Sequence, residues 1–158
     1  MSVRAALRCA PMAGDLPGLR LLRVGDDWDL LRTPAEIGLL ALARLRAIGA
    51  AIGPVLYDSP NERLYYAIRT GAAESWDGLP VRHLSSSSWL VAPGLDLIDN
   101  WFGGWCELPD DDTLTDPAIL RAALHHPYAA AAQEASAGSC RQGFTARLRF
   151  DPTARGHP

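Results

Sequence analysis

The segment Thr33-Pro34-Ala35-Glu36 constrains the fold of this chain more than any other stretch. Thr33 is suited to cap the free backbone N–H groups of a helix, Pro34 suits its first position, and Glu36 completes a capping box. We therefore predict a helix that begins here, ends at Gly49 or Gly53, and packs one face on a core. Its apolar positions recur at helical spacing: Ile37, Leu40, Ala41, Leu45 and Ile48.

Short apolar or alternating segments predict strands around this helix. Two of them, Pro54 to Asp58 and Arg63 to Arg69, are joined by turn residues and predict a β-hairpin. A second helix is predicted from Thr115-Asp116-Pro117 to His125-His126-Pro127. Together these elements predict an α+β fold, a small and mostly antiparallel sheet packed by two or three helices. Further strands are expected at Leu19 to Val24, Pro80 to Leu84, Trp89 to Ala92 and Trp101 to Leu108.

The length of 158 residues suffices for one domain with its own core. Proline and glycine breaks in residues 1–18 predict a flexible lead-in, and residues 19–127 are expected to form the single α/β domain. Residues 128–158 begin as an Ala-, Ser- and Gly-rich linker. Within them, Phe144 to Phe150 alternate with polar residues, which predicts an edge strand or a tail that orders on a partner. Edge-strand pairing would also produce a homodimer.

All fifteen basic residues are arginine, and the formal charge is -3. This balance argues against strong, non-specific nucleic-acid binding, and the lack of lysine is typical of a high-GC bacterial genome. The three cysteines, Cys9, Cys106 and Cys140, match neither a disulfide framework nor a zinc pattern. No secretory signal and no apolar stretch of about 20 residues is present. We expect reduced, mostly buried thiols in a cytoplasmic protein without a membrane partner.

No catalytic or metal motif emerges from the polar clusters of the chain. The serines from Ser85 to Ser88 lack the glycines of a nucleophile elbow and predict a polar turn. Asp110-Asp111-Asp112 lacks the spacing of a calcium loop, and a solvated loop before a helix is the better interpretation. His125 and His126 are adjacent, so they do not share a helix face. We therefore predict no catalytic residue, no metal and no cofactor.

Tryptophans and a few cationic residues are the candidates for binding. Five tryptophans are many for this length, and they suit either a core or an anchor for a partner. Two arginines and a histidine near the predicted hairpin would supply a cationic face, although ordinary surface positions also explain them. The candidate ligand- or partner-binding residues are Trp89, Trp101, Trp105, Arg63, Arg82 and His83.

Four segments resemble one known family. These are Gly53 to Asp58, Leu64 to Ile68, Val81 to Leu84, and Trp89-Leu90-Val91-Ala92-Pro93-Gly94. Their order is similar to the second half of the N-terminal domain of bifunctional DNA primase/polymerases of plasmids and high-GC bacteria. The resemblance covers roughly residues 53–108. It implies that fold and, for the family, a two-metal centre built on an acidic pair, a histidine and a third carboxylate.

The chain departs from the family at each of those catalytic positions. The upstream acids Asp26, Asp27 and Asp29 are expected in a Gly-Asp turn instead of at the end of a buried strand. No acid stands beside Val81, and Arg63 occupies the place of the histidine. The resemblance therefore implies a degenerate domain that has kept the fold and lost the active site.

Three classes of function follow. The leading one is a non-catalytic binding or regulatory module that recognises a protein partner or a nucleotide-containing ligand. The second is an enzyme with acid–base groups at His83 and either Asp58 or Asp77, which requires a carboxylate within hydrogen-bond reach of an accessible His83. The third is a nucleic-acid-binding regulator, which requires five arginines to converge on one surface: Arg44, Arg46, Arg63, Arg69 and Arg82.

Overall fold

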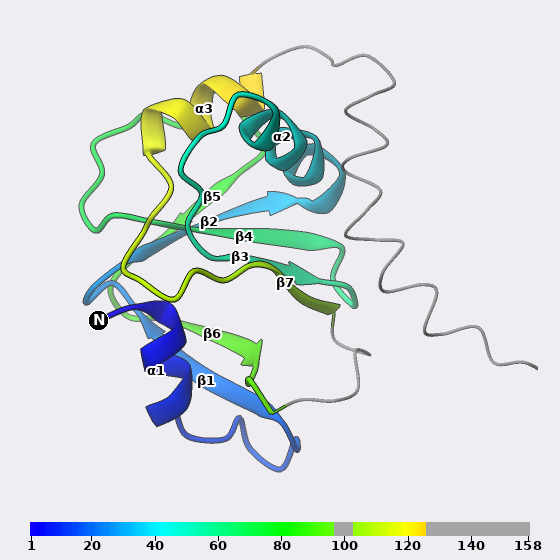
Figure 1. Cartoon of the computed structure of the whole chain (residues 1–158), viewed down its shortest axis with the longest axis vertical. Helices are drawn as coiled ribbons and strands as arrows, with labels where there is room; N and C mark the ends of the chain where they lie inside the picture. The colour runs from blue at the N-terminus through cyan, green and yellow to red at the C-terminus, as the bar shows by residue number, and fades with distance from the viewer. Residues whose placement is uncertain (97–102, 126–158) are drawn as a thin grey trace, which may run out of the picture.

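The computed structural model describes residues 1–96 and 103–125, which form an α+β fold as the sequence predicts (Figure 1). Two antiparallel sheets and three helices make up this part of the chain. The helices are α1 (Val3–Cys9), α2 (Ala35–Ala47) and α3 (Pro117–His125). The strands are β1 (Leu19–Val24), β2 (Asp29–Pro34), β3 (Val55–Asp58), β4 (Arg63–Ile68), β5 (Arg82–Leu84), β6 (Ser88–Pro93) and β7 (Gly103–Glu107).

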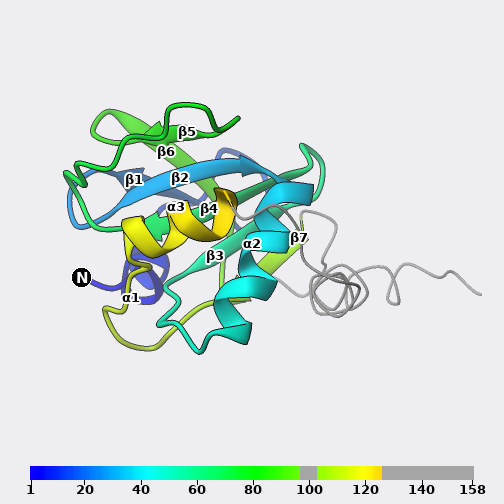
Figure 2. The ribbon, with the colours of Figure 1, turned by 90° about the horizontal axis from the view of Figure 1, so that it is seen from above.

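The larger sheet has the strand order β5-β2-β4-β3-β7, and each neighbouring pair is antiparallel. The predicted hairpin is its β3–β4 pair, in which Asp58 lies opposite Arg63. Strands β1 and β6 form a separate ribbon. Helices α2 and α3 cover one face of the large sheet, while the β1–β6 ribbon and α1 lie on its other side (Figures 1 and 2).

Side chains of the large sheet alternate between two hydrophobic clusters because successive strand residues point to opposite faces. The cluster under α2 and α3 contains Leu31, Leu42, Leu45, Tyr66 and Leu120. The cluster toward α1 and the ribbon contains Leu7, Leu22, Trp28, Leu56 and Leu90. Strand β2 contributes Leu31 to the first and Leu30 to the second, so the polar residues beside them also divide between the two faces.

Helix α2 begins later than predicted, and Thr33 does not cap it. Thr33 is a buried residue of β2, and the helix starts at Ala35 with no side-chain cap on Pro34. The backbone N–H of Ala35 donates to the Glu62 carbonyl at 2.9 Å, which satisfies one free helix group without a capping side chain. The predicted apolar face is also partly wrong, because Ile48 is 58% exposed.

The lead-in expected at residues 1–18 contains helix α1, whose Val3 and Leu7 are buried. The flexible-segment prediction is therefore wrong for Val3–Cys9, because the two apolar residues lie four apart and pack into the core together.

The prediction for the cysteines also fails. Cys9 is exposed, and Cys106 is disulfide-bonded, which removes the argument that reduced thiols gave for a cytoplasmic location.

Several predictions fall outside the described residues. These are Trp101, Cys140 and the tail at 128–158 with its alternating Phe144 to Phe150 segment. Within the described ranges, no helix has the length and apolar character needed to span a membrane.

Candidate functional site

The large sheet brings Arg63 and Arg82 together and adds Arg32 between them. In the register of β2 with β5, Arg32 lies directly opposite Arg82, and in that of β2 with β4 it lies opposite Tyr65. Arg63 precedes Tyr65 by two residues, so it points to the same face. Three neighbouring strands thus present three guanidinium groups on one face.

These arginines line a cavity of about 280 Å³ at one end of the sheet. The end of β2, the β3–β4 turn and the segment before β5 each contribute to its wall. Pro34, Pro80 and Val81 supply apolar surface, and Asn61 supplies an amide. The complete lining is Arg32, Thr33, Pro34, Asn61, Glu62, Arg63, Pro80, Val81 and Arg82.

Positive charge dominates the lining of this cavity, which holds three arginines and one carboxylate, that of Glu62, while Asp58 lies opposite Arg63 outside the lining. Glu62 already accepts a hydrogen bond from the Tyr57 hydroxyl at 3.1 Å. Among the described residues, neither Arg32 nor Arg82 forms an ion pair. The cavity also lies at the N-terminus of α2, where the helix dipole adds positive potential. An anion is therefore the complementary ligand.

Tyr65 lies beside this cluster and provides a neutral hydroxyl. Burial raises the pKa of Tyr65 above its ordinary value, and the Asp58 carboxylate raises it further, while Arg32 and a hydrogen bond with Arg63 oppose the shift. The raised pKa extends the range over which the phenol keeps its proton to a more alkaline pH than usual.

His83 belongs to a different site, although it follows Arg82 directly. Alternation along β5 turns its side chain to the helix-covered face, where His83 Nε2 lies 2.8 Å from Asp29 Oδ2. The Asp29 side chain is 1% exposed and that of His83 is 27% exposed. The Gly71 N–H also donates to Asp29 Oδ2 at 3.2 Å, so a buried carboxylate holds the edge strand β5 and the loop after β4.

The carboxylates predicted to accompany His83 are engaged elsewhere. Asp58 accepts hydrogen bonds from the backbone N–H and side-chain amide of Asn61, and Asp77 accepts one from the Ser75 hydroxyl at 2.8 Å. Asp29 is the partner, and it begins a buried strand where the sequence predicts a Gly-Asp turn. The enzyme alternative required a carboxylate within hydrogen-bond reach of His83, and Asp29 occupies that position instead of Asp58 or Asp77.

The structure does not bring Trp89 and Trp105 together. Trp89 is the second residue of β6 and is 56% exposed, beside a largely apolar cavity of about 230 Å³ that Cys9 and Trp28 also line. Trp105 on β7 is partly buried, and its indole N–H donates to the Pro93 carbonyl at the far end of β6. Four residues of strand, or about 13 Å, separate Trp89 from Pro93. Trp89 and Trp105 therefore lie at opposite ends of β6 and do not form one stacking site.

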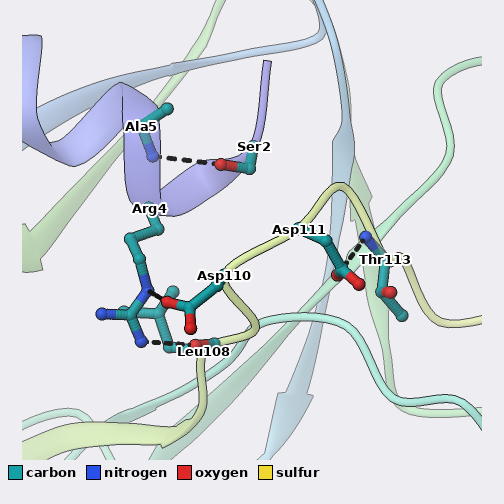
Figure 3. A network of polar contacts seen from close by, with 7 residues as sticks. All are labelled: Ser2, Arg4, Ala5, Leu108, Asp110, Asp111 and Thr113. Carbon is teal, nitrogen blue, oxygen red and sulfur yellow. Dashed lines mark hydrogen bonds and ion pairs between the residues drawn. The ribbon is translucent and has the colours of Figure 1, made fainter.

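The acidic run before α3 has a structural role (Figure 3). Asp110 pairs with Arg4 of α1 at 2.8 Å, and Arg4 also donates to the Leu108 carbonyl at 2.6 Å. The Thr113 side chain lowers the pKa of the Asp111 carboxyl group most, and the Thr113 N–H, which donates to Asp111 Oδ1 at 3.0 Å, lowers it further. No group of three His, Cys, Asp or Glu side chains that could hold a metal ion occurs in the part of the chain the structure describes.

The five arginines required for a nucleic-acid surface do not converge. Arg46 at the end of α2 pairs with Glu107 of β7 at 2.7 Å, whereas Arg82 lies on β5. These two strands are opposite edges of the large sheet. The predicted five-arginine surface is therefore wrong for Arg46.

Comparisons with family models, curated proteins and solved structures find no match for this chain. The candidate sites therefore rest on their own geometry. The sequence analysis does not name Arg32, and it places Asp29 in a turn instead of at the start of a buried strand. Each acquires its role from a partner more than 45 residues away, His83 for Asp29 and Arg82 for Arg32. The alternation of residues along β2 places Asp29 and Leu31 on one face of the sheet and Leu30 and Arg32 on the other.

Proposed function

We propose that this protein is a non-catalytic binding module whose ligand is an anion held in the cavity formed by β2, β4 and β5. One observation supports the proposal most directly: Arg32, Arg63 and Arg82 line one cavity with a single carboxylate. Arginine binds carboxylate and phosphate oxygens in a bidentate manner, and positive potential at a helix N-terminus adds to the attraction. The sequence analysis predicts a nucleotide-containing ligand as one possibility, and this proposal specifies only that the part of the ligand bound in the cavity is anionic.

The rigidity of the scaffold also favours binding. All three arginines stand on adjacent, hydrogen-bonded strands, and Tyr65 between them contacts Arg63. A ligand would meet a surface whose backbone positions are already set, so less conformational entropy is lost on association.

The test is a calorimetric titration of the purified chain with orthophosphate, pyrophosphate and citrate at constant ionic strength. The proposal predicts saturable binding of at least one anion, with the loss of most affinity in Arg32→Gln and Arg82→Gln. Arg23→Gln is the matched control, because Arg23 is an exposed strand arginine outside this cavity that pairs with Asp26 at 3.4 Å. Equal weakening by all three variants would indicate general electrostatics, and the specific site would be rejected.

The hydrogen bond between Asp29 and His83 favours a second candidate, an acid–base centre. Asp29 engages Nε2, which leaves Nδ1 of a partly exposed imidazole for a reacting group. The test is turnover of p-nitrophenyl acetate and p-nitrophenyl phosphate by the chain and by His83→Gln, with His125→Gln as a control for ordinary surface imidazole. A rate that His83→Gln leaves unchanged would reject this candidate.

Two further predictions stay proposals. The kinship with primase/polymerase domains is supported by strands at the four resembling segments, which include β3, β4, β5 and β6.

A protein partner is supported by the exposure of Trp89 beside an apolar cavity. Analytical ultracentrifugation of the chain and of Trp89→Ser tests self-association through that surface.

A further inference from the structure

We propose that the arginine cavity selects a doubly charged phosphoryl group, specifically the dianion of a small organic phosphomonoester. This inference rests on the proposed anion-binding function and specifies which anion is bound. It depends on the apposition of Arg32 and Arg82, on the apolar wall of the cavity, and on its size.

The first argument is the pair Arg32 and Arg82. Residues directly opposite each other on antiparallel strands have Cβ atoms about 5 Å apart, and like charges in this position destabilise the sheet. Their side chains share a face, and among the described residues no carboxylate pairs with either. A monoanion compensates one of the two charges, whereas a dianion compensates both.

The shape of the arginine group supports a tetrahedral oxyanion. Each guanidinium offers a fork of parallel N–H donors, and two guanidinium groups on adjacent strands can share the three non-bridging oxygens of one tetrahedral oxyanion. A phosphomonoester presents three non-bridging oxygens, and a single carboxylate presents two. Arg63 adds a third guanidinium to the lining from the third strand, β4.

The remainder of the cavity implies an organic group on the phosphate. Pro34, Pro80 and Val81 form an apolar wall next to the arginines, which inorganic phosphate would leave uncovered. At about 280 Å³ the cavity is near the lower limit of small-molecule sites, about 300 Å³. Asn61 Nδ2 donates to Asp58 Oδ2 at 2.9 Å, so the amide oxygen of Asn61 remains to accept from a ligand hydroxyl or amine.

The experiment compares two probes of nearly the same shape, phenyl phosphate and phenyl sulfate, at pH 7.5 and pH 5.0. Phenyl sulfate is a monoanion at both values, whereas a phosphomonoester has a second pKa of about 6 and is a dianion only at pH 7.5. We expect phenyl phosphate to bind roughly tenfold more tightly at pH 7.5, through one additional charge-assisted contact, and the preference to fall below about threefold at pH 5.0. Orthophosphate should bind more weakly than phenyl phosphate at pH 7.5.

Arg82→Gln should reduce the preference for phenyl phosphate over phenyl sulfate to near unity, and Arg23→Gln should leave it unchanged. Amide NMR spectra of both variants establish that they fold. Equal affinity for phenyl phosphate and phenyl sulfate at pH 7.5 would overturn the selection of a dianion and leave the anion-binding function standing. Binding of neither probe, nor of any anion in the calorimetric titration, would overturn both proposals.

Discussion

Asp29 and His83 are joined by a hydrogen bond of 2.8 Å between residues 54 positions apart in the chain. The carboxylate is buried at the start of β2, and the imidazole lies on the edge strand β5, which has three residues and pairs only with β2 in the large sheet. This contact, together with the Gly71 N–H bond, ties β5 and the loop after β4 to the sheet. It therefore also supports the position of Arg82, which adjoins His83.

Asp29→Ala should lower the free energy of unfolding by about 2 to 4 kcal/mol, because it leaves the Gly71 N–H and the His83 ring without their acceptor. His83→Ala should lower the free energy of unfolding less, because the His83 side chain is partly exposed and water can replace its hydrogen bond to Asp29. Urea denaturation at pH 7 measures both. Asp77→Ala is the control, because its contact with Ser75 is exposed. A loss in Asp29→Ala no larger than in this control contradicts the structural role.

Tyr66 should make the fold sensitive to alkaline pH. It is fully buried, its hydroxyl donates to the Gly38 carbonyl at 2.7 Å, and burial raises its pKa far above the ordinary value. The folded chain keeps this proton above about pH 10 while the unfolded chain releases it, so the free energy of unfolding falls by up to about 1.4 kcal/mol per pH unit. Denaturation between pH 8 and pH 11 should show a shallower decline in Tyr66→Phe. An unchanged slope would contradict the assignment.

Gly25 should not tolerate a side chain. Its φ is 99°, and an added Cβ would collide with the backbone at Ser86, where the serine turn packs on the β1–β2 turn. Gly25→Ala should therefore destabilise more than Gly14→Ala, whose φ is 59° and whose Cβ would meet open space. Gly14→Ala, the control, should lower the free energy of unfolding by about 1 to 2 kcal/mol, because an alanine in the left-handed conformation is strained. Thermal denaturation measures both, and equal losses would contradict the close packing.

Local chemistry was enough to predict some elements. Asp116 caps α3 as expected, accepting from the Ala118 and Ile119 N–H groups at 2.9 and 3.0 Å. The β3–β4 hairpin was predictable because a short turn joins two alternating segments. In both cases the interacting residues are near neighbours in the chain.

Contacts between distant segments could not be predicted in this way. Strand β1 pairs with β6, and its Val24 faces Ser88 across 64 residues, although neither segment carries a local mark of its partner. The same limit explains why Thr33 was misassigned. A cap and a strand residue before a helix share the same local sequence, and only the pairing of Thr33 with Leu64 distinguishes them. Arg63 and Arg82 could be named from the sequence as members of a cationic face, but the position of Arg32 between them depends on such pairings, and no local motif indicates it.

Replacing Arg82 tests whether the cavity carries uncompensated charge in the absence of ligand. Arg32 and Arg82 are direct cross-strand neighbours. Like charges in this position cost up to about 1 kcal/mol, so Arg82→Gln should leave stability unchanged or raise it by a few tenths of a kcal/mol at low salt. The difference should vanish near 1 M salt, where the Debye length is about 3 Å.

Arg23→Gln provides the opposite expectation, because it removes an exposed ion pair with Asp26 and should lower stability slightly at low salt. Urea denaturation of both variants at 0.02 M and 1 M sodium chloride measures whether each substitution raises or lowers the free energy of unfolding. A gain in stability that accompanies a loss of anion affinity is expected where a binding site holds unpaired charge. If Arg82→Gln instead destabilised the protein equally at both salt concentrations, the Arg32–Arg82 apposition would not be unfavourable. The physical argument for a doubly charged ligand would then fail.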